Sequence, residues 1–191
     1  MELILASQSP RRRELLGLFK LPFTVRVADI DETMDPNLSP AQEVARVSLA
    51  KARAVERQPE DVVIAADTIV VLGDRVLGKP ANEAQAEEML TALSGRAHQV
   101  MTGVTVLRGD RAITATEITD IHFRQLSNRE IRSYIATKEP MDKAGSYGIQ
   151  GGAALFAEKI HGDYYNVVGL PVCRLLRMLR ELAPDIMEDN A

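Results

Sequence analysis

Apolar residues recur along this chain with two different spacings. Residues 3–6 form a short uninterrupted apolar run, which predicts a buried strand. Leu15, Leu16 and Leu18 then follow at the spacing of one helix face. The remaining predicted strands are residues 23–27, 62–72 (a strand pair or one bent strand), 98–107 and 112–123, and the remaining predicted helices are residues 39–57, 82–93, 127–137 and 171–182. This alternation predicts a mixed α/β protein.

Short local signals mark where several of these elements begin and end. Ser39 and Gln42 form a capping box, with Pro40 at the first helical position, and Ser127 begins a second capping box. The polar residues 108–111 separate two β-branched runs, which predicts a hairpin. These signals fix element boundaries independently of the apolar spacing.

Composition limits the number of domains and the class of partner. A length of 191 residues and an apolar content of 46% support one sizeable core, or two small lobes that share one. No repeat or long linker divides the chain, so we expect one domain over residues 1–191, with residues 184–191 as a frayed acidic tail. The net charge of −4, with acids and bases mixed, argues against a nucleic-acid-binding surface.

Cysteine usage and the length of the apolar runs predict a cytoplasmic protein. The single cysteine, Cys173, excludes an internal disulfide and a cysteine-rich zinc site, and its place in an apolar segment before Leu175 and Leu176 predicts a core position. The longest apolar run, residues 62–72, is too short to span a bilayer and is interrupted by Asp67. Charge from Glu2 onward is unlike a signal peptide. We therefore expect no association with a membrane.

Three consecutive arginines, residues 11–13, fall in the first turn of the helix that Ser9 and Pro10 begin. The helix dipole makes each cation there unfavourable by a few tenths to about 1 kcal/mol. A bound anion would explain them, because backbone N–H groups and guanidinium donors would both face it. Residues 7–13 therefore predict a polyphosphate cradle. The alternative is a solvated basic turn paired with Glu14 or another surface carboxylate.

Asp67 is a carboxylate within a long apolar stretch. Residues 62–66 precede it and residues 69–72 follow it, and all of them are aliphatic. Burying a charge without a partner costs several kcal/mol, so such an acid usually binds a metal, acts as a base or caps a turn. The alternative is an acid in a turn between two strands, where it and Thr68 accept backbone N–H groups.

Four further polar residues attract attention to different degrees. Lys79 lies between a glycine and a proline, which predicts a rigid loop, although a surface lysine is the default interpretation. Gln150 lies among the glycines of residues 145–152, where its amide has a donor and an acceptor that suit a base edge. The alternative there is a plain hairpin with a polar tip. Lys51 and Glu32 are ordinary residues when considered alone.

Several motifs follow one another along the chain in a distinctive order. They are Ala6-Ser7-Gln8-Ser9-Pro10-Arg11-Arg12, Ala66-Asp67-Thr68, Gly78-Lys79-Pro80, and Leu93-Ser94-Gly95-Arg96 with His98, Val100, Thr102, Gly103 and Val104. Taken together, these motifs resemble the Maf family of nucleoside triphosphate pyrophosphatases. The resemblance covers residues 3–179, and residues 142–151 and 162–171 are similar to the branch that hydrolyses dTTP and UTP. Gln8 stands where a glycine is frequent in the family.

The resemblance implies a fold, an assembly and a cofactor. It implies a mixed, strongly twisted sheet flanked by helices, in two lobes with a central cleft, of the Maf/ITPase-like type. It also implies a homodimer and dependence on a divalent cation, Mg²⁺ or Mn²⁺.

The resemblance further assigns roles to residues that match the family's motifs. Asp67 matches the catalytic base. The specificity positions are Arg12, Thr68 and Gln150, and the other active-site positions are Ser7, Arg11, Glu32, Lys51 and Lys79. Of these, Ser7, Arg11, Lys51 and Lys79 suit phosphate binding, and the hard oxygen ligands Glu32 and Asp67 suit the metal.

The expected reaction converts a nucleoside triphosphate and water to the monophosphate and pyrophosphate, which would remove unwanted nucleotides from the pool. One alternative is a nucleotide-binding regulator of cell division or septum formation with little turnover. Asp67 and the two lysines favour catalysis over it, because pure binding needs no base. Another alternative is a nucleotidyltransferase, which would need an acceptor site that the sequence does not reveal.

Overall fold

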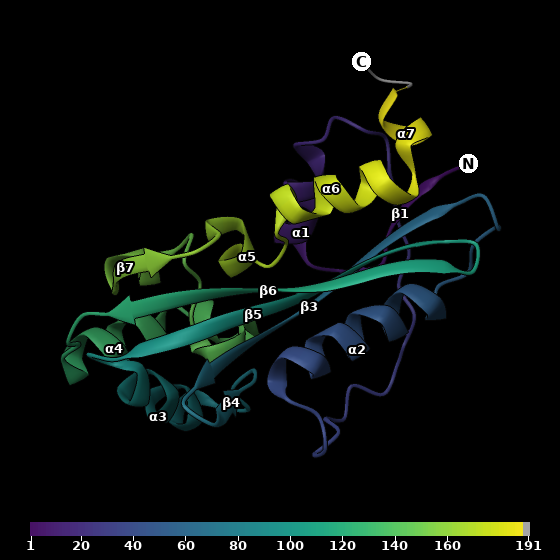
Figure 1. The fold of residues 1–191 in the computed structure, drawn as a ribbon. Coiled ribbons are helices and arrows are strands. Elements are labelled where there is room, and N and C mark those ends of the chain that lie inside the picture. Colours follow the sequence, from purple (N-terminus) through teal and green to yellow (C-terminus); the bar gives the residue numbers. More distant parts are fainter. Residues whose placement is uncertain (189–191) are drawn as a thin grey trace. The chain divides into compact units, whose positions relative to one another are not determined.

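A mixed β-sheet flanked by helices forms the framework of the protein in a computed structural model, which describes residues 1–188 (Figure 1). Within these residues the sheet has seven strands, in the order β2-β1-β3-β5-β6-β7, with β4 paired to β3 off this path. The strands are β1 (Leu3–Leu5), β2 (Thr24–Val25), β3 (Val62–Leu72), β4 (Arg75–Leu77), β5 (Ala97–Arg108), β6 (Arg111–Phe123) and β7 (Ala157–His161). The α-helices are α1 (Pro10–Gly17), α2 (Pro40–Ala54), α3 (Glu83–Leu93), α4 (Asn128–Ala136), α5 (Tyr164–Val168), α6 (Val172–Leu182) and α7 (Pro184–Glu188). The predicted mixed α/β class is confirmed.

Several local sequence signals match the observed elements, and the strand pairing gives the direction of each strand. Both predicted capping boxes are present, at Ser39 before α2 and at Ser127 before α4. Residues 62–72 form one strand, β3, which runs parallel to β1 with Ile4 opposite Val63. β4 and β7 instead pair antiparallel, with β3 and β6 respectively. The sheet is therefore mixed in strand direction as well as flanked by helices.

The described chain divides into two compact units, each with its own buried cluster. The first unit comprises Met1–Asp67, Thr102–Glu117 and the chain from Gly169 onward, and the second comprises Thr68–Met101 and Ile118–Val168. β3, β5 and β6 each contribute residues to both units, because each crosses one of these boundaries. One cluster of the first unit consists of Ile4, Ala6, Ala52, Val55, Val63, Ala65 and Leu107, and the cluster of the second includes Val70, Leu77, Leu90, Leu93, Ile121, Phe123, Ile131, Tyr134 and Phe156.

In the first unit, helix α2 approaches β5 through one glycine. A side-chain carbon at Gly103 would lie 2.1 Å from the carbonyl oxygen of Val44, so only glycine lets the strand and the helix backbone come this close. The hydroxyls of Ser48 in α2 and Thr105 in β5 share a buried hydrogen bond of 2.8 Å. These contacts fix α2, the helix that carries Lys51, against the sheet.

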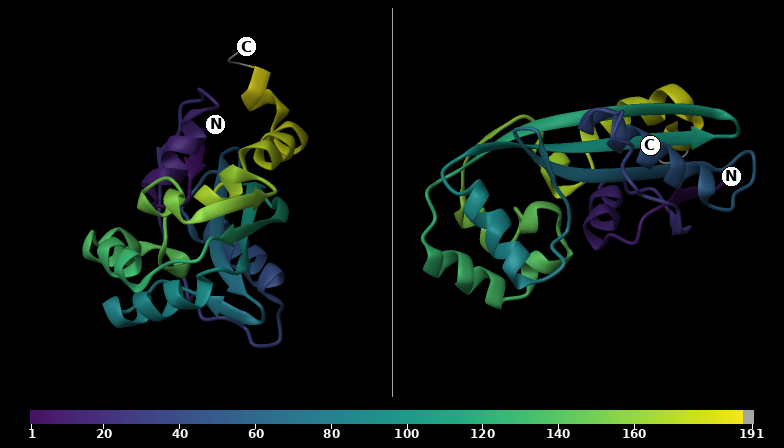
Figure 2. Two further views of the ribbon diagram at one scale, coloured as in Figure 1. Left: turned by 90° about the vertical axis from the view of Figure 1, so that its left-hand side faces the viewer. Right: turned by 90° about the horizontal axis from the view of Figure 1, so that it is seen from below.

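In the second unit, α3 and α4 lie side by side (Figures 1 and 2). Aromatic rings pack edge to face within this unit, with centroids 5.1 Å apart for Tyr134 and Phe156 and 4.8 Å apart for Phe123 and Tyr147. Such pairs add to the stabilisation that burial of the rings provides. Tyr134 lies on α4, and Tyr147 lies in the segment that leads to Gln150. This packing therefore anchors both segments in the second unit.

A buried histidine, His98, joins this aromatic cluster. His98 belongs to β5, and its Nε2 lies 2.9 Å from the hydroxyl oxygen of Tyr147. Burial lowers the pKa of His98 from its ordinary 6.5 to about 4. The unfolded chain therefore takes up a proton at a higher pH than the native protein does. The stabilisation from neutral His98 is complete above pH 6.5 and is lost as the pH falls towards 4.

We expect this one group to lower the free energy of unfolding by about 2.5 kcal/mol between pH 7 and pH 4.5. Urea denaturation at both pH values measures the difference. In His98→Gln the pH-dependent loss should be smaller by that amount, because the glutamine side chain does not titrate. An equal loss in the wild type and the variant would contradict the assignment.

The position of Cys173 differs from its prediction. Cys173 lies in a largely apolar segment before Leu175 and Leu176, yet it is exposed on α6. The buried residues of this helix are Leu175, Met178, Leu179 and Leu182, which share one face. Cys173 lies two positions before Leu175, about 200° around the helix from it. The prediction of a core cysteine was therefore wrong.

The predicted frayed tail also differs from the structure over residues 184–188. These residues form the short helix α7, and both carboxylate oxygens of Asp185 accept hydrogen bonds of 2.7 Å from Arg108. The forked guanidinium matches the carboxylate, which ties α7 to the end of β5. Residues 189–191 of that prediction lie outside the described part of the chain.

Candidate functional site

Ser7 and Asp67 lie at similar levels of two neighbouring parallel strands in the first unit. The N–H of Ala6 donates to the carbonyl oxygen of Ile64 in β3 at 2.8 Å, just after β1 ends. Ser7 therefore follows the carboxyl end of β1, which is where open α/β sheets commonly bind ligands. Asp67 lies within β3 itself, with 16% of its side chain exposed. The alternative of a turn between two strands is wrong for Asp67.

The turn before α1 is organised by two serines and one arginine. Ser9 caps the helix by accepting the backbone N–H of Arg12, as predicted. The guanidinium of Arg12 returns across this turn, where Nη1 donates to Ser7 Oγ at 3.3 Å and Nε donates to the carbonyl oxygen of Gly169 at 2.8 Å. Arg12 is thus fixed by three contacts, so a solvated basic turn does not describe it.

Charges of both signs surround Arg12. Burial lowers the pKa of the Arg12 guanidinium below its usual range, and the Asp67 carboxylate opposes this effect. Arg11 lowers the pKa of Arg12 further, whereas Glu32 raises it. Two arginines and two carboxylates therefore lie close enough to influence one another.

Lys51 bridges the two carboxylates of this group. Its ammonium nitrogen lies 2.8 Å from Asp67 Oδ1 and 2.9 Å from Glu32 Oε1. The Lys51 side chain is 17% exposed, and Glu32 is the most open of the three at 58%. With Arg11 and Arg12, the cluster holds three cations and two carboxylates. Its surplus positive charge suits a polyanionic ligand.

The loop that carries Glu32 is fastened to α2 by an arginine that sequence reasoning missed. Arg46 donates to both carboxylate oxygens of the buried Glu43, at 2.5 and 3.0 Å. Its Nη2 also donates to the carbonyl oxygen of Thr33 at 2.9 Å. Thr33 directly follows Glu32, so α2 positions both Lys51 and its partner Glu32. A glutamate and an arginine three residues apart on a helix are too common to have revealed this role.

The backbone carbonyl of Gly169 was also missed as a partner of Arg12. Nothing in the local sequence links two residues that are 157 positions apart. The resemblance over residues 162–171 drew attention to this segment without indicating a contact. The Gly169 carbonyl oxygen adds a fixed acceptor that holds the Arg12 guanidinium in one orientation.

Three predicted residues belong to the second unit. Thr68 is half-buried in β3, while Lys79 and Gln150 are exposed on separate loops. The N–H of Gly145 donates to the carbonyl oxygen of Gly78 at 3.0 Å, which joins the loop that carries Lys79 to the segment that leads to Gln150. Residues 145–152 run from one 3₁₀ turn, Ala144–Ser146, to the start of another, Gly152–Leu155, and contain no strand of a hairpin.

Two carboxylates of the first unit are suitable for sharing a cation. Glu32 and Asp67 converge on a single ammonium group, and both offer hard oxygen ligands. Within residues 1–188 no group of three or more histidine, cysteine, aspartate or glutamate side chains is arranged to hold a metal ion. The oxygen chemistry of these two carboxylates suits a Mg²⁺-like ion.

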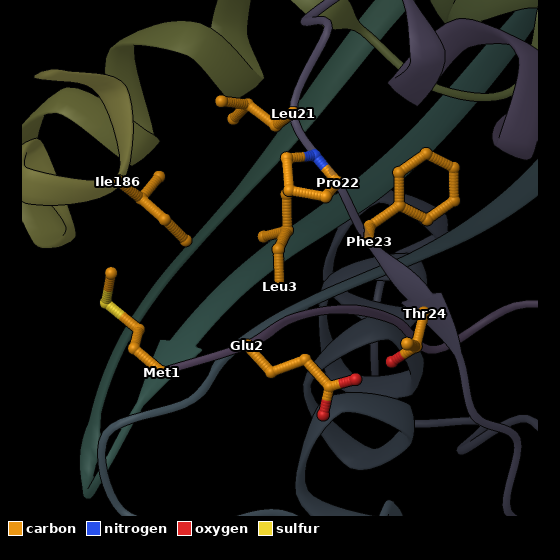
Figure 3. Close-up of a pocket in the computed structure, with 8 residues that line it drawn as sticks. All are labelled: Met1, Glu2, Leu3, Leu21, Pro22, Phe23, Thr24 and Ile186. Carbon is orange, nitrogen blue, oxygen red and sulfur yellow. The ribbon is translucent and has the colours of Figure 1, made fainter. Parts of the chain in front are cut away.

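A separate pocket of about 410 Å³ opens elsewhere in the first unit (Figure 3). Its lining residues are Met1, Glu2, Leu3, Leu21, Pro22, Phe23, Thr24 and Ile186. None of the predicted site residues is among them. The candidate site is therefore defined by its charged cluster and not by this pocket.

Comparison with known structures finds a similar fold. A HAM1 protein from Coxiella burnetii has a similar structure, with a TM-score of 0.53 and 16% sequence identity, over 95% of this chain and 99% of that one. This likeness concerns the fold alone. It agrees with the predicted mixed sheet flanked by helices.

Sequence comparison then gives the family. A family model described as "Maf-like protein" matches residues 2–182, so the chain belongs to the Maf family. A protein of Bacillus cereus strain AH187, described as a dTTP/UTP pyrophosphatase, is 50% identical over 186 residues, 97% of each chain. A protein of Bacillus anthracis strain CDC 684 with the same description is 48% identical over the same proportions.

Proposed function

We propose that this protein hydrolyses dTTP and UTP to the nucleoside monophosphate and pyrophosphate. The observation that carries the proposal is the cluster in which Lys51 joins Glu32 and Asp67 beside Arg12. Relatives that are about half identical over nearly their whole length are described as dTTP/UTP pyrophosphatases. The charged cluster supplies both a polyphosphate-binding surface and a carboxylate, that of Asp67, which can act as a general base.

In the proposed reaction, the first unit binds the triphosphate and activates water. Arg11, Arg12 and Lys51 neutralise phosphate oxygens, with the Ser7 hydroxyl and the start of α1 as further donors. Asp67 accepts a proton from the attacking water. The new bond forms between this water oxygen and the α-phosphorus, and the bond from the α-phosphorus to the bridging oxygen breaks. The electron pair of that bond leaves with pyrophosphate, whose charge the cations stabilise.

A divalent cation, Mg²⁺ or Mn²⁺, is part of the proposal. Glu32 and Asp67 would hold it. When bound, such an ion supplies Lewis-acid stabilisation of charge on the phosphate oxygens. Because Lys51 now bonds to both carboxylates, its ammonium would share them with the cation or turn to a phosphate oxygen.

Second-unit residues complete the proposed assignment. Lys79 would bind phosphate, whereas Thr68 and Gln150 would read the polar edge of the pyrimidine, with Arg12 contributing to substrate choice. The resemblance of their motifs to the family supports these roles.

We also propose a homodimer that acts in the cytoplasm and binds no nucleic acid. The net charge of −4 disfavours binding to nucleic acid. No helix within residues 1–188 has both the length and the apolar character needed to cross a membrane. Size-exclusion chromatography with light scattering measures the assembly, and a monomeric mass would exclude the dimer.

A panel of nucleoside triphosphates, assayed for pyrophosphate release with Mg²⁺ or Mn²⁺, tests the main proposal. We expect turnover with dTTP and UTP above that with CTP and the purine nucleotides. Absence of release with every nucleotide would favour a binding regulator. Release that requires an added acceptor would favour a nucleotidyltransferase.

The role of Gln150 gives a separate prediction. Gln150→Ala should reduce the preference for UTP over CTP by about tenfold, because one amide donor and one acceptor at the base edge are lost. The kcat for UTP should remain within a few-fold of wild type, since Gln150 is not assigned to the chemistry. The ratio of kcat/KM for the two nucleotides measures the preference, and an unchanged ratio would count against base reading by Gln150.

A further inference from the structure

Gln150 lies in a closed β-turn of the second unit. The N–H of Gly151 donates to the carbonyl oxygen of Gly148 at 3.1 Å, so Gln150 is the third residue of a hydrogen-bonded turn. Ile149, the second residue, is buried and anchors the turn, whereas Gln150 is exposed. The turn thus exposes the glutamine amide while the buried Ile149 anchors the backbone beside it.

Two side chains from outside the turn hold it at both ends. The hydroxyl of Tyr134 accepts the N–H of Gly148 at 3.0 Å and donates to Glu139 Oε1 at 2.9 Å. The other carboxylate oxygen of Glu139 accepts the N–H of Gly152 at 3.1 Å. The chain therefore leaves a tyrosine–glutamate pair at residue 148 and returns to the same pair at residue 152, with Gln150 midway.

Two glycines beside Gln150 lie against the side chains of Glu139 and Lys143. A side-chain carbon at Gly151 would lie 2.1 Å from Glu139 Oε1, and one at Gly148 would lie 2.7 Å from the Cε of Lys143. A side-chain carbon at either position would make the end of the Glu139 or Lys143 side chain move, and Glu139 is held in place by its bonds to Tyr134 and Gly152. Lys143 in turn donates to the Glu139 carbonyl oxygen at 2.7 Å. Glycine at positions 148 and 151 therefore leaves room for the Glu139 contacts as they stand.

The Tyr134 hydroxyl is well suited to this position. Burial raises the pKa of Tyr134, and the Glu139 carboxylate raises it further, so the hydroxyl stays protonated and donates. Its oxygen meanwhile accepts the Gly148 N–H, which uses both hydrogen-bonding functions of the group. Tyr134 is 5% exposed and its ring packs against Phe156, so it acts through the turn and not on a ligand.

We propose that Tyr134 and Glu139 are positioning residues that hold Gln150 in the orientation needed to discriminate among pyrimidine bases. The inference rests on the proposed function for its substrate and on the proposed base reading by Gln150. A hydrogen-bonding amide discriminates only if its donor and acceptor are held in register with the base edge, because small displacements weaken both bonds. Holding the turn at both ends provides that restraint.

The sharpest variant is Tyr134→Phe, because it removes the hydroxyl and keeps the packed ring. We expect the UTP over CTP ratio of kcat/KM to fall about five- to tenfold, mainly through a raised KM for UTP, with kcat for UTP within about threefold of wild type. Glu139→Gln should have a smaller effect, since an amide oxygen can still accept the Gly152 N–H. Glu88→Gln serves as a control, because it removes only an exposed ion pair with Arg75.

A double variant separates positioning from general loosening. If Tyr134 acts through Gln150, then Tyr134→Phe combined with Gln150→Ala should lose no more discrimination than Gln150→Ala alone. Additive losses would overturn the proposal, and so would an unchanged ratio in Tyr134→Phe.

Hydrogen exchange provides a readout that needs no turnover. The amides of Gly148 and Gly152 should exchange at least about fivefold faster in Tyr134→Phe than in wild type, with no change in Glu88→Gln. Unchanged exchange would show that the pair does not hold the turn, whatever the enzyme hydrolyses. Faster exchange together with no pyrophosphate release from any nucleotide would leave the restraint standing, and would overturn both the proposed function and the base discrimination that depends on it.

Discussion

Replacing Asp67 by asparagine should lower kcat for pyrophosphate release by about 10²- to 10⁴-fold, the usual contribution of a general base. Asparagine has nearly the same size and shape, and its amide oxygen can still accept the hydrogen bond that Asp67 Oδ1 now receives from Lys51 at 2.8 Å. The variant should therefore fold, and the loss should appear in turnover rather than in stability. Steady-state kinetics with UTP, together with thermal unfolding, separate the two.

The matched control for this substitution is Asp74→Asn. Asp74 is exposed in the turn between β3 and β4, so the same chemical change there should leave kcat within about twofold of wild type. Wild-type turnover in Asp67→Asn would remove Asp67 from the mechanism. A large loss accompanied by unfolding would instead assign it a structural role.

The second large effect is expected at Gly103, an uncharged residue to which no role in the chemistry is assigned. In Gly103→Ala the new methyl would lie 2.1 Å from Val44 O, 2.3 Å from Val44 C and 2.7 Å from Ala45 N. All three are backbone atoms of α2, so no side chain can turn aside. Overpacking of this kind lowers the free energy of unfolding by about 3 kcal/mol or more.

Because α2 carries Lys51, the folded fraction of Gly103→Ala should also lose activity. Urea denaturation measures the stability, and Gly17→Ala is the control, because nothing lies within 4 Å of a side-chain carbon at Gly17. The control should be neutral or slightly stabilising, since alanine is favoured over glycine in a helix. Equal stability of Gly103→Ala and wild type would show that α2 can shift without cost.

The residues of the candidate site were predictable to different extents. Asp67 could be identified from sequence, because a carboxylate within an aliphatic run is costly wherever the chain places it. The arginines of α1 could also be identified, because the direction of the helix dipole follows from the helix start. Lys51 and Glu32 were ordinary in sequence and were assigned only by family resemblance. Their significance lies in a shared contact between residues 19 positions apart in sequence.

The sequence by itself determined the longer helices and strands and where α2 and α4 begin, because capping and apolar spacing act over three or four neighbouring residues. The short elements β4, β7, α5 and α7 were not predicted. It also marked Asp67 as exceptional. Only the tertiary structure decided what the glycines of β5 and of the Gln150 turn accommodate, that Arg46 holds the Glu32 loop, and that Cys173 faces solvent. Each of these depends on a contact or a helix face whose partner is distant along the chain, and local spacing contains no information about which distant backbone or side chain will arrive there.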